Sequence, residues 1–143
     1  MPSLKRRRRR RDKLKTKKKM EKINFKDKLK IKMDNYAHFI YKITKKFPKE
    51  ELYGTTSQFR RATLSIILNY IEGYARRRPS VQFNFLEISY GSLKESKYLL
   101  FFSLKENYIN KKEYETGLKL ADEIGAMLWT EISSLEKTLK VLK

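Results

Sequence analysis

Apolar side chains recur at steps of three and four residues over most of the chain, beginning near Phe25. This spacing places them on one face of an α-helix, because a helix turns once every 3.6 residues. The first series consists of Phe25, Leu29, Met33, Tyr36, Ile40, Ile43 and Phe47. It ends at the Phe47-Pro48 step, since the residue before a proline avoids helical backbone angles. The pattern leaves open whether this helix begins at Asn24 or near Asp34.

A second helical segment lies between two breaks in the chain. Gly54 interrupts the pattern before it, and small hydroxyl residues that favour the helix N-cap follow directly. The candidate caps are Thr55, Thr56 and Ser57. The segment then runs to about Arg77 without a proline, which at 1.5 Å per residue makes a helix of roughly 33 Å.

Two more helices are predicted in the second half of the chain. Pro79 and Ser80 form a turn and begin a third helix that ends near Asn107. Asn110 caps the fourth helix. The apolar residues of the fourth helix recur at heptad-like spacing: Tyr114, Leu118, Ala121, Ile124, Leu128, Ile132, Leu135, Leu139 and Leu142.

The connections between these helices are short, which places consecutive helices antiparallel. No segment of useful length alternates apolar and polar residues as a strand does. The sequence therefore predicts an all-α chain with two parts: a basic arm over residues 1–22 and an antiparallel up-down four-helix bundle over residues 23–143.

Positive charge is concentrated at the N-terminus. Residues 1–32 carry 17 Lys or Arg against three acidic residues, and the formal net charge of the whole chain is +19. The densest clusters are Arg6, Arg7, Arg8, Arg9, Arg10 and Arg11, followed by Lys17, Lys18 and Lys19. Like charges at this density repel one another, so we expect the arm to be disordered without a partner. The guanidinium group donates two parallel hydrogen bonds to one phosphate, which favours RNA as that partner.

Three other roles for the arm stay open: a nuclear-import signal, a contact with an anionic membrane, and a solubilising tail. The arm has no apolar face to enter a membrane surface. No apolar run in the chain approaches the ~18 residues that a membrane-spanning helix needs, and no apolar stretch of a secretory signal follows the basic N-terminus. We therefore expect a cytoplasmic protein with no membrane partner.

Few residues of this chain can support catalysis or bind metals. The chain has no cysteine and only one histidine, His38, which excludes thiolate sites, cysteine nucleophiles and multi-histidine sites. Carboxylate bundles that hold two metals use Glu-x-x-His motifs, and no glutamate here is followed three residues later by histidine. The chain also lacks a glycine-rich phosphate loop and a nucleophile elbow. We expect no cofactor, no metal and no enzymatic activity.

Polar residues form a continuous stripe along the predicted second helix: Arg61, Ser65, Asn69, Glu72 and Arg76. On the third helix Glu87, Gly91 and Glu95 share one face, and Gly91 removes a side chain midway along it. We expect arginines and carboxylates of the two helices to form a polar network at a helix–helix or subunit contact. The alternative is a solvated face with ordinary charge pairs within each helix.

Several short segments carry a more specific likeness. They are FPKEELYG (47–54), TSQFRRA (56–62), Ser65-Ile66, Asn69, EGY (72–74), Phe85-Leu86, GSLKE (91–95), YLL (98–100), DEI (122–124) and Met127-Leu128. Over about Asp34 to Leu139 the chain resembles the bacterial four-helix bundle protein family, which includes the proteins encoded by intervening sequences of 23S ribosomal RNA genes. It is also similar to the accessory variability determinant proteins of diversity-generating retroelements.

The resemblance implies an antiparallel four-helix bundle that assembles into a ring, typically a pentamer, with a basic surface. It implies no catalytic activity. In the retroelement members that surface engages a partner reverse transcriptase and the template RNA. The chain departs from the pattern at Ile67, where members often have proline, and in its arginine-rich arm, since members tend to start close to the first helix.

We therefore predict a non-enzymatic, homo-oligomeric RNA-binding protein of the bacterial cytoplasm. The leading hypothesis is an accessory factor of a diversity-generating retroelement that binds template RNA and a reverse transcriptase. The alternatives are a protein associated with the ribosome or rRNA and encoded by a 23S rRNA intervening sequence, and a protein-interaction scaffold. Phosphate contacts are expected from the two clusters of the arm and from Arg60, Arg61, Arg76, Arg77 and Arg78.

Overall fold

The computed structural model describes the backbone of residues 4–142 and the side chains of residues 4–18 and 25–142. Over this range the chain forms five helices and no strand, which confirms the predicted all-α class. They are α1 (Leu4–Thr44), a short 3₁₀-helix η1 (Lys49–Glu51), α2 (Thr55–Ala75), α3 (Pro79–Lys105) and α4 (Lys111–Val141).

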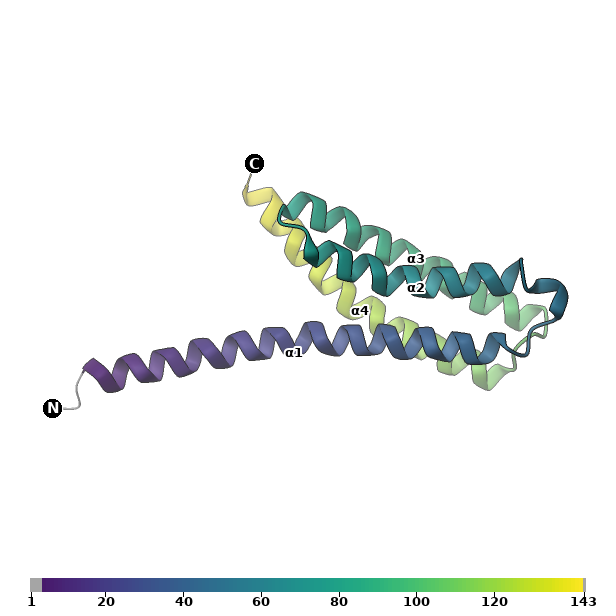
Figure 1. The fold of residues 1–143 in the computed structure, drawn as a ribbon, viewed down its shortest axis with the longest axis horizontal. Coiled ribbons are helices and arrows are strands. Elements are labelled where there is room, and N and C mark those ends of the chain that lie inside the picture. The colour runs from purple at the N-terminus through teal and green to yellow at the C-terminus, as the bar shows by residue number, and fades with distance from the viewer. Residues whose placement is uncertain (1–3, 143) are drawn as a thin grey trace.

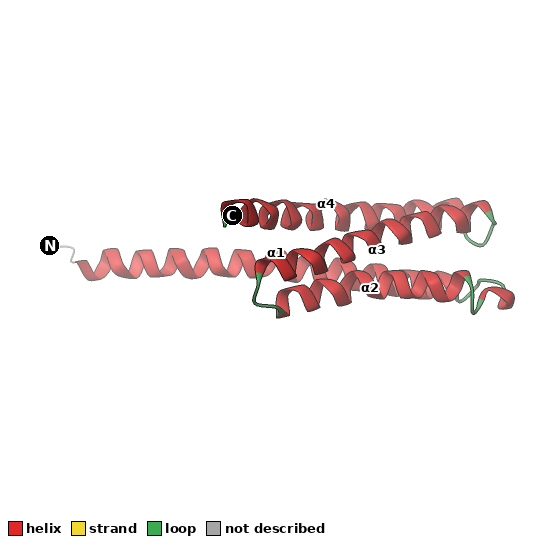
Figure 2. Ribbon diagram, turned by 90° about the horizontal axis from the view of Figure 1, so that it is seen from above, coloured by secondary structure: helices red, strands yellow, loops and turns green. Residues whose placement is uncertain are grey.

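The four α-helices lie side by side, and consecutive helices run in opposite directions (Figure 1). Helix α2 packs on α1 and α3, and α4 packs on α3 and α1. Figure 2 shows that α1 extends well beyond the other helices at its N-terminal end. Within the described range, none of the helices combines the length and apolarity that a membrane crossing needs.

The core lies between the four helices and takes fully buried side chains from each of them. They include Leu29, Met33 and Ile40 of α1, Phe59 and Ile66 of α2, Leu86, Leu93 and Leu100 of α3, and Ile124 and Leu128 of α4. Burying one such side chain contributes about 1.5–3 kcal/mol. The stripes of the sequence pattern therefore face one another, as the steps of three and four require.

Two buried tyrosines connect helices that face each other diagonally across this core. The Tyr36 hydroxyl on α1 donates a hydrogen bond to Ser96 Oγ on α3 over 2.9 Å. The Tyr70 hydroxyl on α2 donates to Glu131 Oε1 on α4 over 2.7 Å. A buried hydroxyl without a partner costs about 1–3 kcal/mol, so these two bonds favour one register of the four helices.

The N-terminal arm is helical where disorder was expected. Residues 4–22 continue α1 without a break, so the predicted boundary between residues 22 and 23 falls inside a helix. No proline or glycine lies between Leu4 and Thr44, and Lys and Arg are good helix formers. The packed part of α1 already supplies the helical nucleus, so extension adds residues without the cost of nucleation. These two effects outweigh the repulsion between the charges.

The start of α2 also differs from the prediction. Its N-cap is Gly54, and none of residues 55–57 caps it by a side chain. The backbone N–H of Thr55 donates instead to Glu51 Oε2 over 2.9 Å, because η1 brings this carboxylate over the first turn of α2. The helix ends at Ala75 rather than Arg77.

At α4 the predicted cap is present. Asn110 Oδ1 accepts a hydrogen bond from the Glu113 backbone N–H over 2.8 Å, and the Glu113 carboxylate accepts from the Asn110 backbone N–H over 3.0 Å. We expect Asn110→Ala to lower the free energy of unfolding by about 1 kcal/mol, since it removes a side-chain cap. Urea unfolding followed by circular dichroism measures this. Asn84→Ala, at an exposed position inside α3, is the control and should not lower stability.

The pKa values of two capping carboxylates predict loss of stability in acid. The hydrogen bond from Thr55 lowers the pKa of Glu51, and at Glu113 the bonds from Lys46 and Asn110 lower the pKa against the opposing effect of burial. The unfolded chain therefore takes up these protons at higher pH than the folded chain, and stability falls as the pH drops below the ordinary value of 4.5. Melting temperatures between pH 7 and pH 3 should fall more steeply for the parent than for Glu51→Gln. Parallel curves would contradict this.

Candidate nucleic-acid interface

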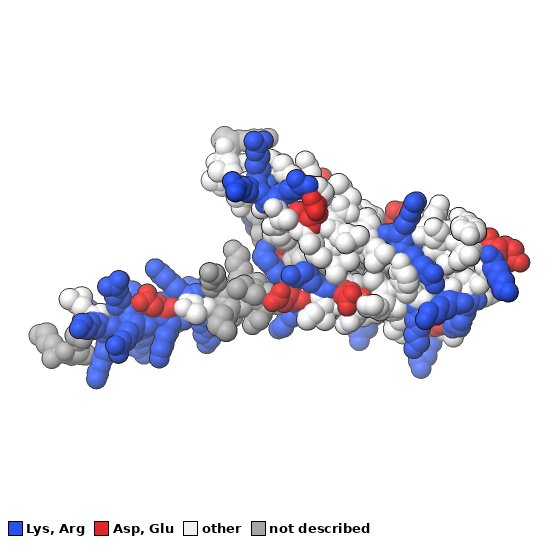
Figure 3. All heavy atoms as spheres, in the orientation of Figure 1, with Lys and Arg blue, Asp and Glu red and all other residues white. Residues whose placement is uncertain are grey.

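The arm presents cations on every side of a helix. Side chains of residues 4–18 are all exposed, including Arg6 to Arg11, Lys17 and Lys18, whereas the Lys19 side chain lies outside the described residues. Successive residues are rotated by about 100°, so six consecutive arginines cover the whole circumference. Asp12 is the one acidic residue among residues 4–18. Figure 3 shows this dense positive charge on the arm, beside a body with charges of both signs.

The turn between α2 and α3 adds three arginines at the same end of the molecule. Arg76, Arg77 and Arg78 are exposed, and Figure 1 places this turn at the end of the body from which the arm projects. Arg76 forms an ion pair with Glu72 one turn earlier in α2, and its guanidinium lies 5.3 Å from the centre of the Phe85 ring. The structure thus brings two of the predicted groups of cations to one end.

Arg60 and Arg61 lie at the opposite end, near the start of α2. The guanidinium of Arg60 is already engaged by α1: Nε donates to Thr44 Oγ1 over 2.9 Å, and the group lies 4.7 Å from the centre of the Tyr41 ring. Arg61 is exposed. This part of the predicted phosphate-contacting set is therefore separated from the arm by roughly the 30 Å length of a 21-residue helix.

The polar stripe of α2 forms a network, though not the one expected. Ser65 Oγ lies 2.8 Å from Ser92 Oγ on α3, and Asn69 Nδ2 donates to Ser65 Oγ over 2.8 Å. The bond between the two helices is thus made by neutral side chains. Among the described residues, the α2 arginines form no ion pair with Glu87 or Glu95 of α3.

The predicted α3 face lies at the surface of the single chain. Glu87, Gly91 and Glu95 are all exposed, and a Cβ built on Gly91 would meet no atom within 4 Å. In this single chain nothing uses the space that the missing side chain leaves. The face belongs to the solvated surface, or to a contact with another chain.

We expect Gly91→Ala to raise the free energy of unfolding by roughly 0.5–1 kcal/mol, because glycine inside a helix costs about that much relative to alanine. Thermal unfolding measures it. Gly117→Ala is the contrasting variant and should lower stability, since a Cβ there would lie 2.8 Å from Leu100 Cδ2 in the core. A loss of stability on Gly91→Ala would show that another chain packs against this glycine.

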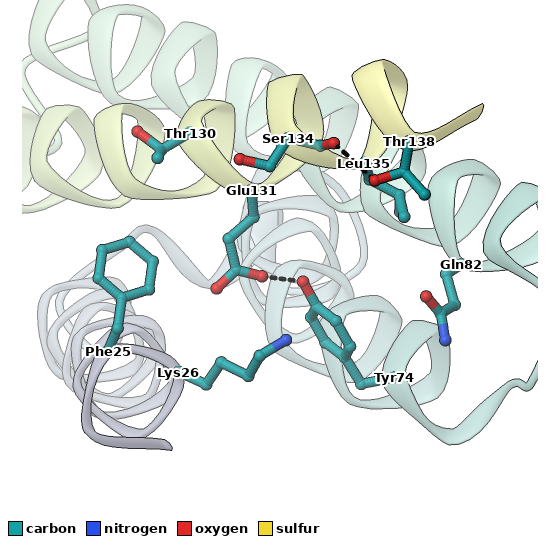
Figure 4. A pocket seen from close by; sticks show the side chains of 9 residues that line it. All are labelled: Phe25, Lys26, Tyr74, Gln82, Thr130, Glu131, Ser134, Leu135 and Thr138. Carbon is teal, nitrogen blue, oxygen red and sulfur yellow. Dashed lines mark hydrogen bonds between the residues drawn. The ribbon is translucent and has the colours of Figure 1, made fainter. Parts of the chain in front are cut away.

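A cavity of about 450 Å³ lies at the arm end of the body, between α1, α2, α3 and α4. Its lining residues are Phe25, Lys26, Tyr74, Gln82, Thr130, Glu131, Ser134, Leu135 and Thr138, shown in Figure 4. Glu131 is 9% exposed and accepts hydrogen bonds from Tyr70 and Tyr74. The ammonium of Lys26 lies 3.3 Å from the centre of the Tyr74 ring.

The surroundings of the two tyrosines fix their protonation. Burial, and next the hydrogen bond to Glu131, raise the pKa of both Tyr70 and Tyr74 above the usual value of 10.0. Both hydroxyls therefore stay protonated at neutral pH, and each donates a hydrogen bond to Glu131. Nowhere in the described range do three or more His, Asp or Glu side chains gather as metal ligands would.

Glu131 was not among the residues singled out from the sequence, although a signal exists. It lies three residues after Leu128 and four before Leu135, which is a core position of the α4 pattern. A carboxylate at such a position needs donors from other helices. Tyr70 and Tyr74 of α2 supply these donors. In the sequence, however, both tyrosines also fit the apolar stripe of α2, so nothing marked them as partners of a carboxylate.

Comparison with solved structures supports this arrangement of helices. A crystal structure of a protein of unknown function from the S23 ribosomal protein family of Bacteroides thetaiotaomicron VPI-5482 superimposes with a TM-score of 0.71. The alignment has 24% sequence identity and covers 76% of this chain and 98% of that one. This likeness shows the fold alone. No curated protein sequence matches the chain.

The sequence profile of one family matches most of the body. It is described as the 23S rRNA-intervening sequence protein family, and the match covers residues 27–130. The matched range begins after the arm and ends just before Glu131, so the arm and part of the cavity wall lie outside it. The predicted family is confirmed: the chain belongs to the 23S rRNA-intervening sequence protein family.

Proposed function

We propose that this chain is a non-enzymatic RNA-binding protein that acts as a homo-oligomer. The observation that carries the proposal is the projecting basic helix. From Leu4 to Phe25 its backbone extends about 30 Å, and the arginine and lysine side chains of residues 4–18 lie around its circumference. RNA phosphates match this display, and their neutralisation releases counterions, which favours binding.

The family supports one cellular setting for this activity. Its description links its members to intervening sequences of 23S rRNA, which supports rRNA in the bacterial cytoplasm as the RNA partner. A second setting rests on the likeness to accessory variability determinant proteins of diversity-generating retroelements. There the partners are a template RNA and a reverse transcriptase.

Exposed apolar side chains support an oligomer of four-helix bundles. On α2, Leu64, Leu68 and Ile71 form one exposed stripe, and Leu68 is 59% exposed. Other exposed apolar side chains lie on α3 and α4: Ile88, Tyr98 and Trp129 are 52%, 62% and 54% exposed. Exposed apolar side chains in such stripes commonly mark association sites. When two different surfaces of a subunit bind each other, the subunits join head to tail. Such a chain of subunits closes into a ring if the rotation from one subunit to the next permits it, and the resemblance implies a ring of five.

The salt dependence of RNA binding tests the proposal. Protein freed of nucleic acid is titrated into a labelled RNA at 50–200 mM salt, and the slope of log K against log salt is compared with that of a variant lacking residues 1–22. Each phosphate contact contributes about 0.7–0.9 to the slope, so the variant should bind more weakly with a shallower slope. A second variant with Arg6 to Arg11 changed to glutamine keeps the length of the chain and removes only charge.

Affinity that does not respond to salt, or no affinity for RNA at 50 mM salt, overturns the proposal. The protein-interaction scaffold then becomes the better hypothesis. It predicts that a partner protein is captured from nuclease-treated lysate equally well with and without residues 1–22.

A further inference from the structure

The cavity lined by Glu131 lies where the arm joins the body. Phe25 and Lys26, which line it from α1, follow directly on the arm in the same helix. Gln82 lines it from the first turn of α3, next to the arginine turn of residues 76–78. An RNA that lies along the arm and against that turn therefore passes the mouth of the cavity.

The buried carboxylate makes the floor of the cavity a hydrogen-bond acceptor. Glu131 accepts one hydrogen bond at each oxygen, from Tyr70 at Oε1 and from Tyr74 at Oε2. Each oxygen of this carboxyl group has two lone pairs, and one hydrogen bond to each oxygen leaves a lone pair that can accept a further bond. Figure 4 shows the Glu131 carboxylate pointing from α4 into the space between Phe25 and Tyr74.

Other polar groups of the wall also present acceptors. The hydroxyls of Thr130 and Thr138 each donate a hydrogen bond to a backbone carbonyl four residues earlier in α4, over 3.0 Å and 3.2 Å. Their oxygen lone pairs are then the groups that can pair with a ligand. Gln82 donates from Nε2 to the Arg76 carbonyl over 2.7 Å, and Figure 4 shows its amide oxygen on the side of Tyr74. A ligand that pairs with Glu131, Gln82 and these hydroxyls must bring several N–H donors, whereas the Lys26 ammonium on the same wall is itself a donor.

The ligand should also be planar and uncharged at the donor edge. The ring of Phe25 is half-buried and offers a surface on which a base can stack. The Lys26 ammonium already lies against Tyr74 at the cavity, so it repels an additional cation such as an amine or guanidinium. A cavity of about 450 Å³ is within the usual range for small-ligand sites.

We propose that this cavity binds one unpaired guanosine of the RNA that the arm holds, an inference that rests on the proposed RNA-binding function. Guanine is neutral and presents three N–H donors side by side, one on N1 and two on N2. Each of the other bases presents only one donor group on its pairing edge. The arm then supplies affinity through phosphates, and the cavity supplies a preference for one base.

Hairpin RNAs that differ in one bulged nucleotide test this with the full-length protein. The bulge is guanosine, inosine, which lacks the 2-amino group, or adenosine. We expect the guanosine hairpin to bind about tenfold more tightly than the other two, since a hydrogen bond to a charged group is lost. Salt dependence is recorded for each hairpin.

Two variants assign the preference to the cavity. Ser134→Phe places a ring at an exposed position on the rim, and it should abolish the guanosine preference while leaving the salt slope unchanged. Thr116→Phe, exposed on α4 away from the cavity, should retain the preference. Glu131→Gln, which replaces the acceptor but keeps its size, should weaken it.

The outcomes separate this inference from the proposed function. Equal affinity for guanosine and inosine hairpins, with a steep salt slope, overturns the guanosine site and leaves RNA binding intact. A preference that survives Ser134→Phe also overturns it. Failure to bind any of the hairpins at low salt overturns both.

Discussion

We expect Glu131→Leu to lower the free energy of unfolding by about 3 kcal/mol, as measured by urea titration followed by circular dichroism. The carboxylate accepts one hydrogen bond from Tyr70 and another from Tyr74, and Tyr70 is only 1% exposed. Leucine can fill the space but offers no acceptor, so the Tyr70 hydroxyl is left in the core without a partner. This loss of stability is larger than the roughly 1 kcal/mol expected when the Asn110 cap is removed, because a buried hydroxyl is left without an acceptor.

A double variant distinguishes this explanation from a simple loss of packing. Tyr70→Phe together with Glu131→Leu removes both ends of the buried bond, and it should recover part of the stability lost in Glu131→Leu alone. Glu115→Leu, at an exposed position on the same helix, is the control and should change stability little. If Glu131→Leu unfolds at the same urea concentration as the parent, the hydrogen bonds contribute no net stability.

The helices could be predicted from the sequence because local signals determine them. The steps between Leu29, Met33 and Tyr36 locate the buried face of α1, and all three side chains are fully buried. Helix α1 ends at Thr44, three residues before the predicted end at Phe47, and Pro79 is the first residue of α3. Asn110 caps α4 with Glu113, as its position before an apolar series indicated.

The parts that differ depend on effects that a local pattern does not contain. Residues 4–22 are helical because they extend a helix whose nucleus lies in the packed body. The cap of α2 comes from Glu51, and only the fold of η1 brings that carboxylate back to Thr55. Both differences arise from contacts with neighbouring parts of the fold rather than from the composition of the segment itself.

The candidate site could be predicted only as a set of charges. Arginine and lysine clusters are visible in the sequence, but their placement is not: the arm and Arg76 to Arg78 share one end, whereas Arg60 and Arg61 lie at the other. The cavity could not be predicted, because its wall combines residues from Phe25 to Thr138. The arm lies outside residues 27–130, the range matched by the family, so membership in the family does not predict any RNA affinity that the arm provides.

We expect Leu68→Asp to convert the proposed ring into single subunits and to change the stability of each subunit little. Leu68 is 59% exposed in the middle of the α2 stripe, so the charge is solvated in a free subunit. In a subunit contact the same carboxylate would be desolvated against apolar side chains, at a cost of several kcal/mol. Sedimentation velocity measures the change in mass, and urea unfolding measures the stability of the subunit.

The same variant should weaken binding to a long RNA by roughly 10²-fold or more, because several arms on one ring act together by avidity. A short RNA that occupies a single arm should bind the variant and the parent equally well, since Leu68→Asp leaves the arm unchanged. Thr116→Asp, exposed on α4, is the matched control and should keep the assembly. If the parent sediments as a single subunit, or if Leu68→Asp keeps the parent's mass, the α2 stripe is not a subunit contact. In the first case any preference for long RNA must come from one arm binding along the strand, and in the second case another surface joins the subunits.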